Sequence, residues 1–313
     1  MNPLTGLYGA ASALRNTLFD RGVLVSRRLE RPVVSVGNLS VGGSGKTPFV
    51  IALGELLEAR GISFDVLSRG YGRKTRGALV VDAKGSAADF GDEPLLIARR
   101  LGVPVIVGES RYEAGKLMEK TRPSQLHILD DGFQHRSLAR DFDIVLVAQH
   151  DFDDCLLPSG RLREPLAALA RADAIVLPVE ADGRAALQGK LLWRMKREVV
   201  VSSPPPTPIA FCGIARPEQF FAQLRAISVS AAAEIAFRDH HAYRRDDIDR
   251  LLKVRAKLGA GGFITTEKDI INLGLLRDTL TPLAVAVLQC SLVDPADILD
   301  AILNRIGDRM PQT

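Results

Sequence analysis

The stretch from Gly37 to Thr47 reads GNLSVGGSGKT, and it decides the fold that we predict for this chain. The β-branched run PVVSVG at 32–37 leads into it, and a pattern typical of a helix continues from it over 48–60. Backbone N–H groups in a glycine-rich turn bind polyphosphates together with the start of the following helix. This order of strand, turn and helix predicts a phosphate-binding loop (P-loop).

Several positions of the loop have an expected task. Lys46 should reach the β- and γ-phosphates of a nucleotide, and the Thr47 hydroxyl should bind Mg²⁺. The residues expected to surround the phosphates are Gly42, Gly43, Ser44, Gly45, Lys46, Thr47 and Pro48. Ser40 stands where the general P-loop pattern has glycine, so an ordinary strand–helix turn is the alternative.

A P-loop protein also needs a carboxylate for its metal ion. The strand pattern LHILD at 126–130 ends in Asp130, and Asp131 follows it. Both side chains would emerge at the carboxyl edge of a parallel sheet, beside the P-loop. We therefore expect both near Mg²⁺, although one of them could instead cap the following turn.

Short β-branched runs alternate with helical patterns along the chain. Strands are expected at 32–37, 63–67, 78–82, 103–107, 126–130, 143–148 and 174–178, and helices near 48–60, 92–101, 110–120, 162–172 and 183–196. This alternation predicts an α/β fold of the P-loop NTPase type, with a mostly parallel sheet and helices on both faces.

The proline-rich segment SSPPPTP at 202–208 is the clear break in this pattern, because proline continues neither a helix nor a central strand. A chain of 313 residues suits two domains. We expect an N-terminal amphipathic helix in 1–31, a P-loop domain at 32–201, a linker at 202–208 and a smaller C-terminal α/β domain at 209–313.

Composition excludes several classes of protein. The chain has 41 Lys and Arg against 37 Asp and Glu, a balance too mild to indicate a nucleic-acid partner. Its three cysteines are far apart in the sequence, which argues against a disulfide framework and a zinc site. Apolar runs fall short of the ~20 residues that span a bilayer, and no secretory signal is expected.

The loops indicate which kind of P-loop protein this is. The segment TTEKD at 265–269 resembles a guanine-binding motif, but its Lys and Asp are adjacent, which disfavours a GTPase. Three loops suit a phosphotransferase: SRGYGRK at 68–74, GDEP at 91–94 and PSGRLREP at 158–165. Asp92 of GDEP is either a helix cap or the base that accepts a substrate hydroxyl proton.

Taken together, these motifs resemble the tetraacyldisaccharide 4′-kinase (lipid A 4′-kinase) family of Gram-negative bacteria. The resemblance rests on VGNLSVGGSGKTP, SRGYGR, GDEP, LDDGFQH, LPSGRLREP, FCGIARPEQFF, FRDHHAY and TTEKD, which occur in this order along nearly the whole chain. The pair LDDGFQH and SRGYGR is far more specific than a P-loop alone.

The resemblance implies ATP- and Mg²⁺-dependent phosphorylation of the 4′-hydroxyl of an acylated glucosamine disaccharide 1-phosphate, giving the 1,4′-bisphosphate. It implies that Asp92 is the base, paired with His240, and that Lys46 acts on the transferred phosphate. Glu93, Asp130 and Asp131 would serve Mg²⁺ with Thr47. The substrate side is expected to comprise Arg69, Gly70, Tyr71, Arg163 and Glu164. His241 is the less certain of the two histidines.

The lipid substrate gives the N-terminal segment an expected role. Apolar residues recur at Leu4, Leu7, Ala11, Leu14 and Leu18, and residues 1–31 contain five arginines against two acidic residues. Such a helix can lie in an anionic membrane interface, or it can pack on its own domain. We expect a peripheral protein on the cytoplasmic face of the inner membrane, with no obligate protein partner.

Two other functions stay open from the residues. One is a non-catalytic P-loop switch that hydrolyses nucleotide slowly without an acceptor. The other is a kinase of a soluble small acceptor. A histidine supplied by the second domain would complete a kinase site when the domains close, which would exclude water from the transfer.

Overall fold

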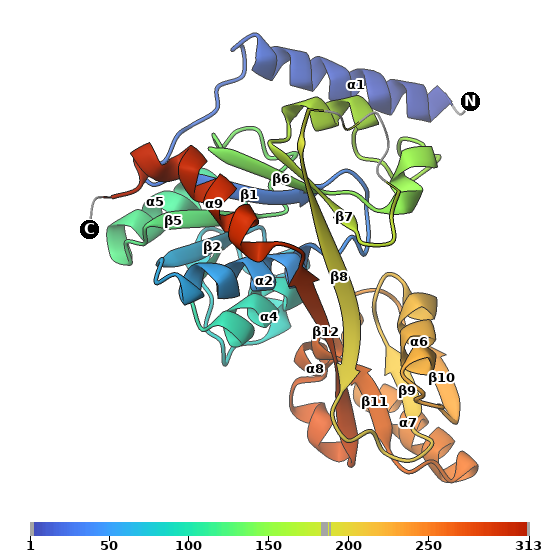
Figure 1. Ribbon diagram of the computed structural model, residues 1–313. Helices are drawn as coiled ribbons and strands as arrows, with labels where there is room; N and C mark the ends of the chain where they lie inside the picture. Colours follow the sequence, from blue (N-terminus) through green and yellow to red (C-terminus); the bar gives the residue numbers. More distant parts are fainter. Residues whose placement is uncertain (1–2, 183–186, 188, 312–313) are drawn as a thin grey trace.

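The computed structural model describes residues 3–182, 187 and 189–311, and its strands form one continuous twelve-stranded sheet (Figure 1). The strands are β1 (Val33–Asn38), β2 (Phe64–Ser68), β3 (Leu79–Val80), β4 (Val105–Val107), β5 (Leu126–Asp130), β6 (Phe142–Leu146), β7 (Ala174–Pro178), β8 (Leu191–Val201), β9 (Ile209–Cys212), β10 (Ala233–Ala236), β11 (Phe263–Thr266) and β12 (Leu283–Leu292).

Strand order confirms the predicted sheet. The order across it is β10-β9-β11-β12-β8-β7-β6-β1-β5-β2-β4-β3. Neighbouring strands are parallel, except that β8 pairs with β12 and β3 with β4 in antiparallel fashion. The P-loop strand β1 is fully buried between β5 and β6, as a strand covered by helices on both faces must be.

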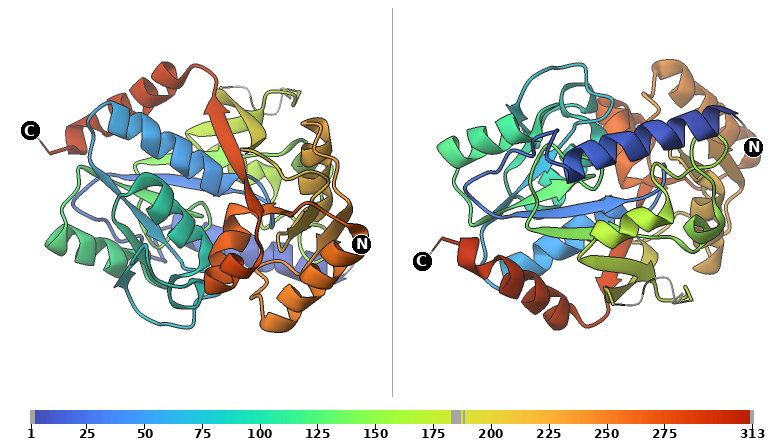
Figure 2. Two further views of the ribbon diagram at one scale, coloured as in Figure 1. Left: turned by 90° about the horizontal axis from the view of Figure 1, so that it is seen from below. Right: turned by 90° about the horizontal axis from the view of Figure 1, so that it is seen from above.

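Helices cover both faces of the sheet (Figure 2). They are α1 (Pro3–Asp20), α2 (Lys46–Ala59), α3 (Ala87–Phe90), α4 (Asp92–Leu101), α5 (Arg111–Thr121), α6 (Pro217–Ala226), α7 (Arg245–Leu258), α8 (Glu267–Leu273) and α9 (Pro295–Ile306), with 3₁₀ turns η1 (Gln149–Asp153), η2 (Leu166–Arg171), η4 (Gly274–Thr279) and η5 (Gly307–Arg309). Apolar residues of α2, α4 and α9 share one core with the sheet, and α5 packs in a separate core on the other face.

Two predicted helices are wrong in part. Residues 191–196 of the helix expected at 183–196 belong to β8, where Trp193 and Met195 point inward between more exposed neighbours. This period of two is that of a strand, and β8 is held on both sides by β7 and β12. Residues 183–186 and 188 lie outside the described part of the chain. The helix expected at 162–172 is only the 3₁₀ turn η2.

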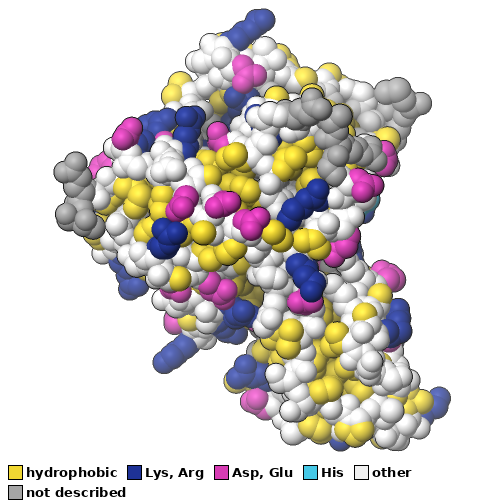
Figure 3. Space-filling view, viewed as in Figure 1, with side chains coloured by type: hydrophobic (Ala, Val, Ile, Leu, Met, Phe, Trp, Pro, Cys, Tyr) yellow, Lys and Arg dark blue, Asp and Glu magenta, His cyan; other side chains and the backbone are white. Residues whose placement is uncertain are grey.

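A smaller lobe, built around β9 to β11, projects from the larger one (Figures 1 and 3). The proline-rich segment 202–208 connects β8 to β9. After β12, α9 returns to the larger lobe, where Ile298 and Ile302 are buried against the core that contains α2. The sheet runs through both lobes, so the domain boundary at 202–208 stays a prediction.

Candidate active site

A cavity of about 1100 Å³ lies at the carboxyl ends of β1, β2 and β5, between the two lobes and beneath α1. Predicted site residues that line it are Gly42, Gly43, Ser44, Gly45, Lys46, Thr47, Pro48, Arg69, Tyr71, Glu93, Asp130, Asp131, Arg163, Glu164 and His240. Asp92 is buried behind His240, and Gly70 forms the turn between Arg69 and Tyr71 with φ 69°. One cavity therefore gathers motifs that are far apart in the sequence.

The P-loop owes its shape to glycines and to a buried asparagine. Gly45 has φ 86°, in the left-handed region that favours glycine, and α2 starts directly after it. The Asn38 side chain donates to the Ser40 carbonyl at 2.6 Å and to Ser44 Oγ at 2.8 Å. Its Oδ1 accepts from Lys46 Nζ at 3.0 Å. Sequence reasoning missed Asn38, although its place at the end of the strand that leads into the loop is a signal.

The two aspartates after β5 have opposite electrostatic surroundings. Asp130 accepts from Ser68 Oγ at 3.0 Å, while its buried Oδ1 has no partner among the described residues. Burial, with Glu93 and Asp131 nearby, raises the pKa of Asp130 to about 7. Asp131 instead forms ion pairs with Arg163 at 3.0 Å and Lys46 at 3.2 Å. These two cations outweigh the effect of burial and lower the pKa of Asp131.

Asp92 and His240 are in direct contact across the lobes. Gly91, at φ 88°, is the N-cap of α4, and Asp92 is the first residue of the helix rather than its cap. Asp92 Oδ1 accepts from the neighbouring Glu93 N–H at 2.8 Å. Asp92 Oδ2 lies 2.7 Å from His240 Nδ1. This hydrogen bond raises the pKa of His240 above its usual value. Burial raises the pKa of Asp92, but His240 and Lys268 outweigh it, so the carboxyl stays ionised.

Further residues around this pair were not predicted. Lys268 forms an ion pair with Glu93, and Asn272 Nδ2 lies 3.4 Å from Asp92 Oδ2. The Tyr71 ring packs against His240 with centroids 5.3 Å apart. Lys268 belongs to the TTEKD segment, which sequence reasoning used only to disfavour guanine binding. Its task in this fold is to place a positive charge beside two acidic residues.

The other histidine of the DHH motif, His241, points elsewhere. Its Nε2 lies 3.0 Å from Asp247 Oδ2, and its ring stacks on Phe237 at 4.8 Å. His241 does not line the cavity. Its contacts are those of a structural residue in the smaller lobe.

The loop at 158–165 is anchored to α1. Glu164 Oε2 accepts from Asn16 Nδ2 and from Arg171, both at 2.7 Å. Tyr8 donates to the Arg163 carbonyl at 3.0 Å. The polar face of α1 thus packs on the larger lobe, while Leu7 is 69% exposed on the opposite face. The predicted helix is confirmed, and its apolar stripe faces away from the protein.

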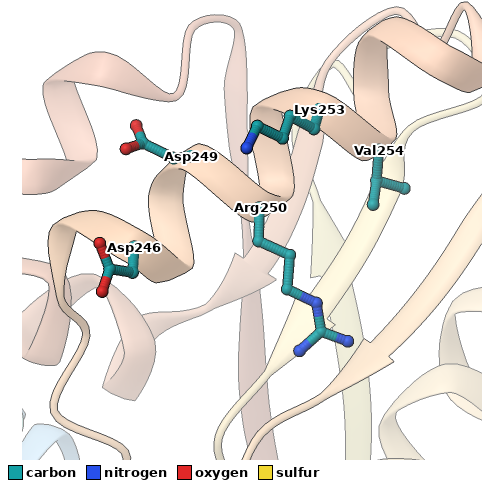
Figure 4. A pocket seen from close by; sticks show the side chains of 5 residues that line it. All are labelled: Asp246, Asp249, Arg250, Lys253 and Val254. Carbon is teal, nitrogen blue, oxygen red and sulfur yellow. The ribbon is translucent and has the colours of Figure 1, made fainter.

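A second, smaller hollow of about 430 Å³ lies on α7, lined by Asp246, Asp249, Arg250, Lys253 and Val254 (Figure 4). Its acidic and basic groups are mixed on a single helix, and none of the motifs reaches it. Among the described residues, no set of three or more His, Cys, Asp or Glu side chains could by itself hold a metal ion. None of the described helices is long and apolar enough to cross a bilayer.

Comparison with known proteins agrees with this geometry. Residues 1–307 match the LpxK family, described as tetraacyldisaccharide-1-P 4′-kinase. A tetraacyldisaccharide 4′-kinase of Koribacter versatilis is 48% identical over 99% of both chains, and one of Geobacter metallireducens is 38% identical over 94% of both. The crystal structure of an "apo" form of LpxK from Aquifex aeolicus in complex with ATP is similar, with a TM-score of 0.80, 34% identity and coverage of 97% of this chain and 98% of that one. The chain belongs to the tetraacyldisaccharide-1-P 4′-kinase family.

Proposed function

We propose that this protein transfers the γ-phosphate of ATP to the 4′-hydroxyl of a tetraacylated glucosamine disaccharide 1-phosphate, a lipid A precursor, giving the 1,4′-bisphosphate. The observation that carries this proposal is the Asp92–His240 pair, which lies at the same cavity as the P-loop Lys46. Phosphoryl transfer needs positioning and charge neutralisation. The cavity supplies both, together with a base.

The P-loop binds the triphosphate of ATP in the proposed reaction. Backbone N–H groups of residues 42–47 surround the phosphates, and Lys46 neutralises charge on the β- and γ-phosphates. In the structure the Lys46 ammonium is held by Asn38 and Asp131. It therefore already lies at the start of α2, where the phosphates would bind.

The residues next to the P-loop fit a magnesium ion. Asp130 offers a buried oxygen without a partner, and its raised pKa shows that a cation there would be favourable. Thr47 would supply a hydroxyl and Asp130 a carboxylate, with Asp131 and Glu93 around them. When bound, Mg²⁺ neutralises charge on the transferred phosphoryl group.

Asp92 accepts the proton of the attacking hydroxyl. Its carboxylate is ionised, and the hydrogen bond to His240 Nδ1 fixes its orientation. A neutral His240 leaves Asp92 more basic than a charged one does, because a positive charge at 2.7 Å stabilises the carboxylate. His240 therefore acts with Asp92 and sets the pH at which it works.

The sugar phosphate binds along the Arg69–Tyr71 turn and the Arg163–Glu164 loop. Arg69 and Tyr71 are exposed at the cavity wall beside His240. Arg163 forms an ion pair with Asp131 and also lines the cavity, where its guanidinium can contact phosphate oxygens. The Glu164 carboxylate pairs with Arg171 and so links this loop to η2.

The outward face of α1 contacts the lipid surface. Leu4, Leu7 and Leu14 are 59–69% exposed there, and Val23 and Val25 continue the apolar surface. Basic charge contributes less than the sequence indicates, because Arg27 pairs with Glu113 and Arg28 with Asp141. We place the protein peripherally on the cytoplasmic face of the inner membrane of a Gram-negative bacterium, with α1 at the interface.

A transfer assay tests the function. The full chain is incubated with γ-labelled ATP, Mg²⁺ and an acylated disaccharide 1-phosphate in detergent micelles, and the labelled lipid is analysed by mass spectrometry. We expect one phosphate at the 4′-hydroxyl and little release of free phosphate. Hydrolysis of ATP with no labelled lipid would contradict the proposal and would favour a nucleotide switch.

A further inference from the structure

The smaller lobe contacts the glycines of the P-loop directly. A Cβ atom on Gly45 would lie 3.0 Å from Arg197 Nη1, and one on Gly43 would lie 3.2 Å from Arg216 Cδ and Nε. Ala215, beside Arg216, lies 3.7 Å from the same position on Gly42. Arg197 comes from β8, and Arg216 comes from the FCGIARPEQFF segment just before α6. Two arginines far apart in the sequence therefore flank one loop.

These arginines lie on the side of the loop away from the catalytic carboxylates. The P-loop follows β1, and β1 lies between β5 and β6. Asp130 ends β5 and Asp131 follows it, on one side of β1. On the other side, Arg197 lies on β8, and Arg216 donates to His150 Nε2, in the turn η1 after β6, at 2.9 Å. The loop thus has the two aspartates on one side and the two arginines on the other.

The basic side lacks a negative partner. Among the described residues, neither Arg197 nor Arg216 forms an ion pair, whereas Arg163 at the same cavity pairs with Asp131. Both side chains are half-buried and line the cavity. Burial lowers the pKa of both groups, and the more distant acidic residues Glu180, Asp151 and Asp154 offset this only in part. Partly buried charges are normally paired, so this pair is suited to an anion.

We propose that Arg197 and Arg216 bind the α- and β-phosphates of ATP from the side of the smaller lobe. Guanidinium groups form paired hydrogen bonds with phosphate oxygens. The γ-phosphate has to lie near Lys46 and the Asp92–His240 pair, so the nucleoside end extends toward the arginines. A nucleotide bound in this way connects β1 and α2 of the larger lobe to β8 and α6 of the smaller lobe.

The cavity wall beyond the arginines supports a nucleotide rather than the acceptor phosphate. Val199, Phe220, Ala286 and Leu288 form an apolar wall there, which suits the faces of a purine ring. Acyl chains must reach the lipid surface at α1, and α1 lies over the larger lobe while α6 lies in the smaller one (Figure 1). The arginine side of the cavity is therefore left to the nucleoside end of ATP.

Nucleotide binding to the acceptor-free full-length protein tests this inference without requiring activity. The variants are Arg197→Ala and Arg216→Ala, each with its Lys counterpart, and binding of ATP and ADP is measured by calorimetry. We expect each Ala variant to weaken ATP and ADP about equally, by roughly tenfold, and each Lys variant to weaken them less. Arg225→Ala, which removes an exposed arginine of α6 paired with Glu234, should leave binding unchanged.

Steady-state kinetics show whether the two arginines bind the phosphates of ATP or the phosphate of the lipid acceptor. The proposal predicts a higher KM for ATP with an unchanged KM for the lipid acceptor. An unchanged affinity for ATP in both Ala variants would overturn it, whether or not the KM for the acceptor rises. Thermal unfolding curves that match the parent protein establish that a loss of binding is local, and the Lys variants give the same test should an Ala variant fail to fold. The inference rests on the proposed function but can fail without it. If the Ala variants bind ATP normally, the inference is wrong, while the protein can still phosphorylate the 4′-hydroxyl.

Discussion

Asp92 and His240 show how one hydrogen bond gives two residues a task that neither has alone. Asp92 alone would be a carboxylate in the first turn of α4, and His240 a polar residue in a loop. Their contact at 2.7 Å joins the start of α4 to the smaller lobe beside the phosphate-binding loop. The contact raises the pKa of His240 and helps to lower that of Asp92. We therefore expect the proposed phosphate transfer to depend on pH through this pair.

The pH profile should report the titration of His240. Protonated His240 makes Asp92 a weaker base, so kcat/KM is expected to rise with pH through a pKa above the usual 6.5 of histidine. His240→Ala should lower kcat and remove this limb of the profile. The measurement is kcat/KM from pH 5.5 to 9 for both proteins. An identical acidic limb in the variant would show that another group sets it.

A second histidine should affect stability instead of activity. His127 is fully buried, with Nδ1 2.7 Å from Asp65 and Nε2 3.5 Å from Glu119. Burial lowers its pKa, but the two carboxylates outweigh this and raise the value to about 9. Because the pKa of His127 is higher in the folded than in the unfolded protein, His127 stabilises the fold fully below pH ~6.5. This stabilisation disappears as the pH rises through 9. The difference between the two pKa values corresponds to a stabilisation of the folded protein of about 3 kcal/mol.

Urea unfolding at several pH values checks this prediction. The difference in unfolding free energy between the parent protein and His127→Gln should be largest near pH 6 and should shrink by pH 9.5. Because His127 lies on β5 with its side chain bonded to β2, far along these strands from their carboxyl ends, nucleotide binding should not change. A difference that stays constant with pH would show that His127 is neutral in the folded protein.

At the scale of elements, α1 differs from an ordinary surface helix because its polar face is turned inward. Asn16 and Tyr8 bond to the loop at 158–165, and the leucines face outward. An amphipathic pattern identifies the polar and the apolar face of a helix, but it does not show which face packs on the protein. The sequence therefore predicted the helix, while the structure alone shows that its apolar face points away from the protein.

Vesicle binding tests the lipid-facing role of α1. Leu7→Ser combined with Leu14→Ser removes two exposed leucines, and we expect binding to anionic phospholipid vesicles to weaken by at least about tenfold. Leu275→Ser is the matched control, since Leu275 is 88% exposed but lies on η4 in the smaller lobe. Co-sedimentation gives the measurement. Equal binding of the double variant and the control would remove α1 from the account of membrane contact.

The strand β8 explains why part of the site could not be predicted. Its first half, LLWRMK, reads as helical because its apolar and basic residues have no strict alternation. Pairing with β7 and β12, which lies 82 or more residues further along the chain, decides that it is a strand. Arg197 on β8 therefore had no predicted place beside the P-loop. Local motifs such as GGSGKT and LDD, in contrast, could be placed from the sequence, because neighbouring residues determine their structure.

At the scale of the whole molecule, the sheet brings the two lobes to a single cavity. Residues of β1, β5 and α4 contribute the phosphate loop and the carboxylates, and the smaller lobe contributes His240 and Lys268. The order of strands in a sheet depends on long-range pairing, which a single sequence does not specify. The motifs in the sequence predicted most of the residues at the cavity, whereas the fold determined which of them touch and added Asn38, Lys268 and Arg197.

The most direct test of the account compares phosphate transfer by the parent protein and by Asp92→Ala. Label from γ-labelled ATP is followed into an acylated disaccharide 1-phosphate, and ATP affinity is measured on the same preparations. We predict that Asp92→Ala lowers kcat by about 100-fold or more, while its affinity for ATP changes by less than about threefold. Transfer at the parent rate by Asp92→Ala would contradict the central claim that Asp92 is the base for the 4′-hydroxyl.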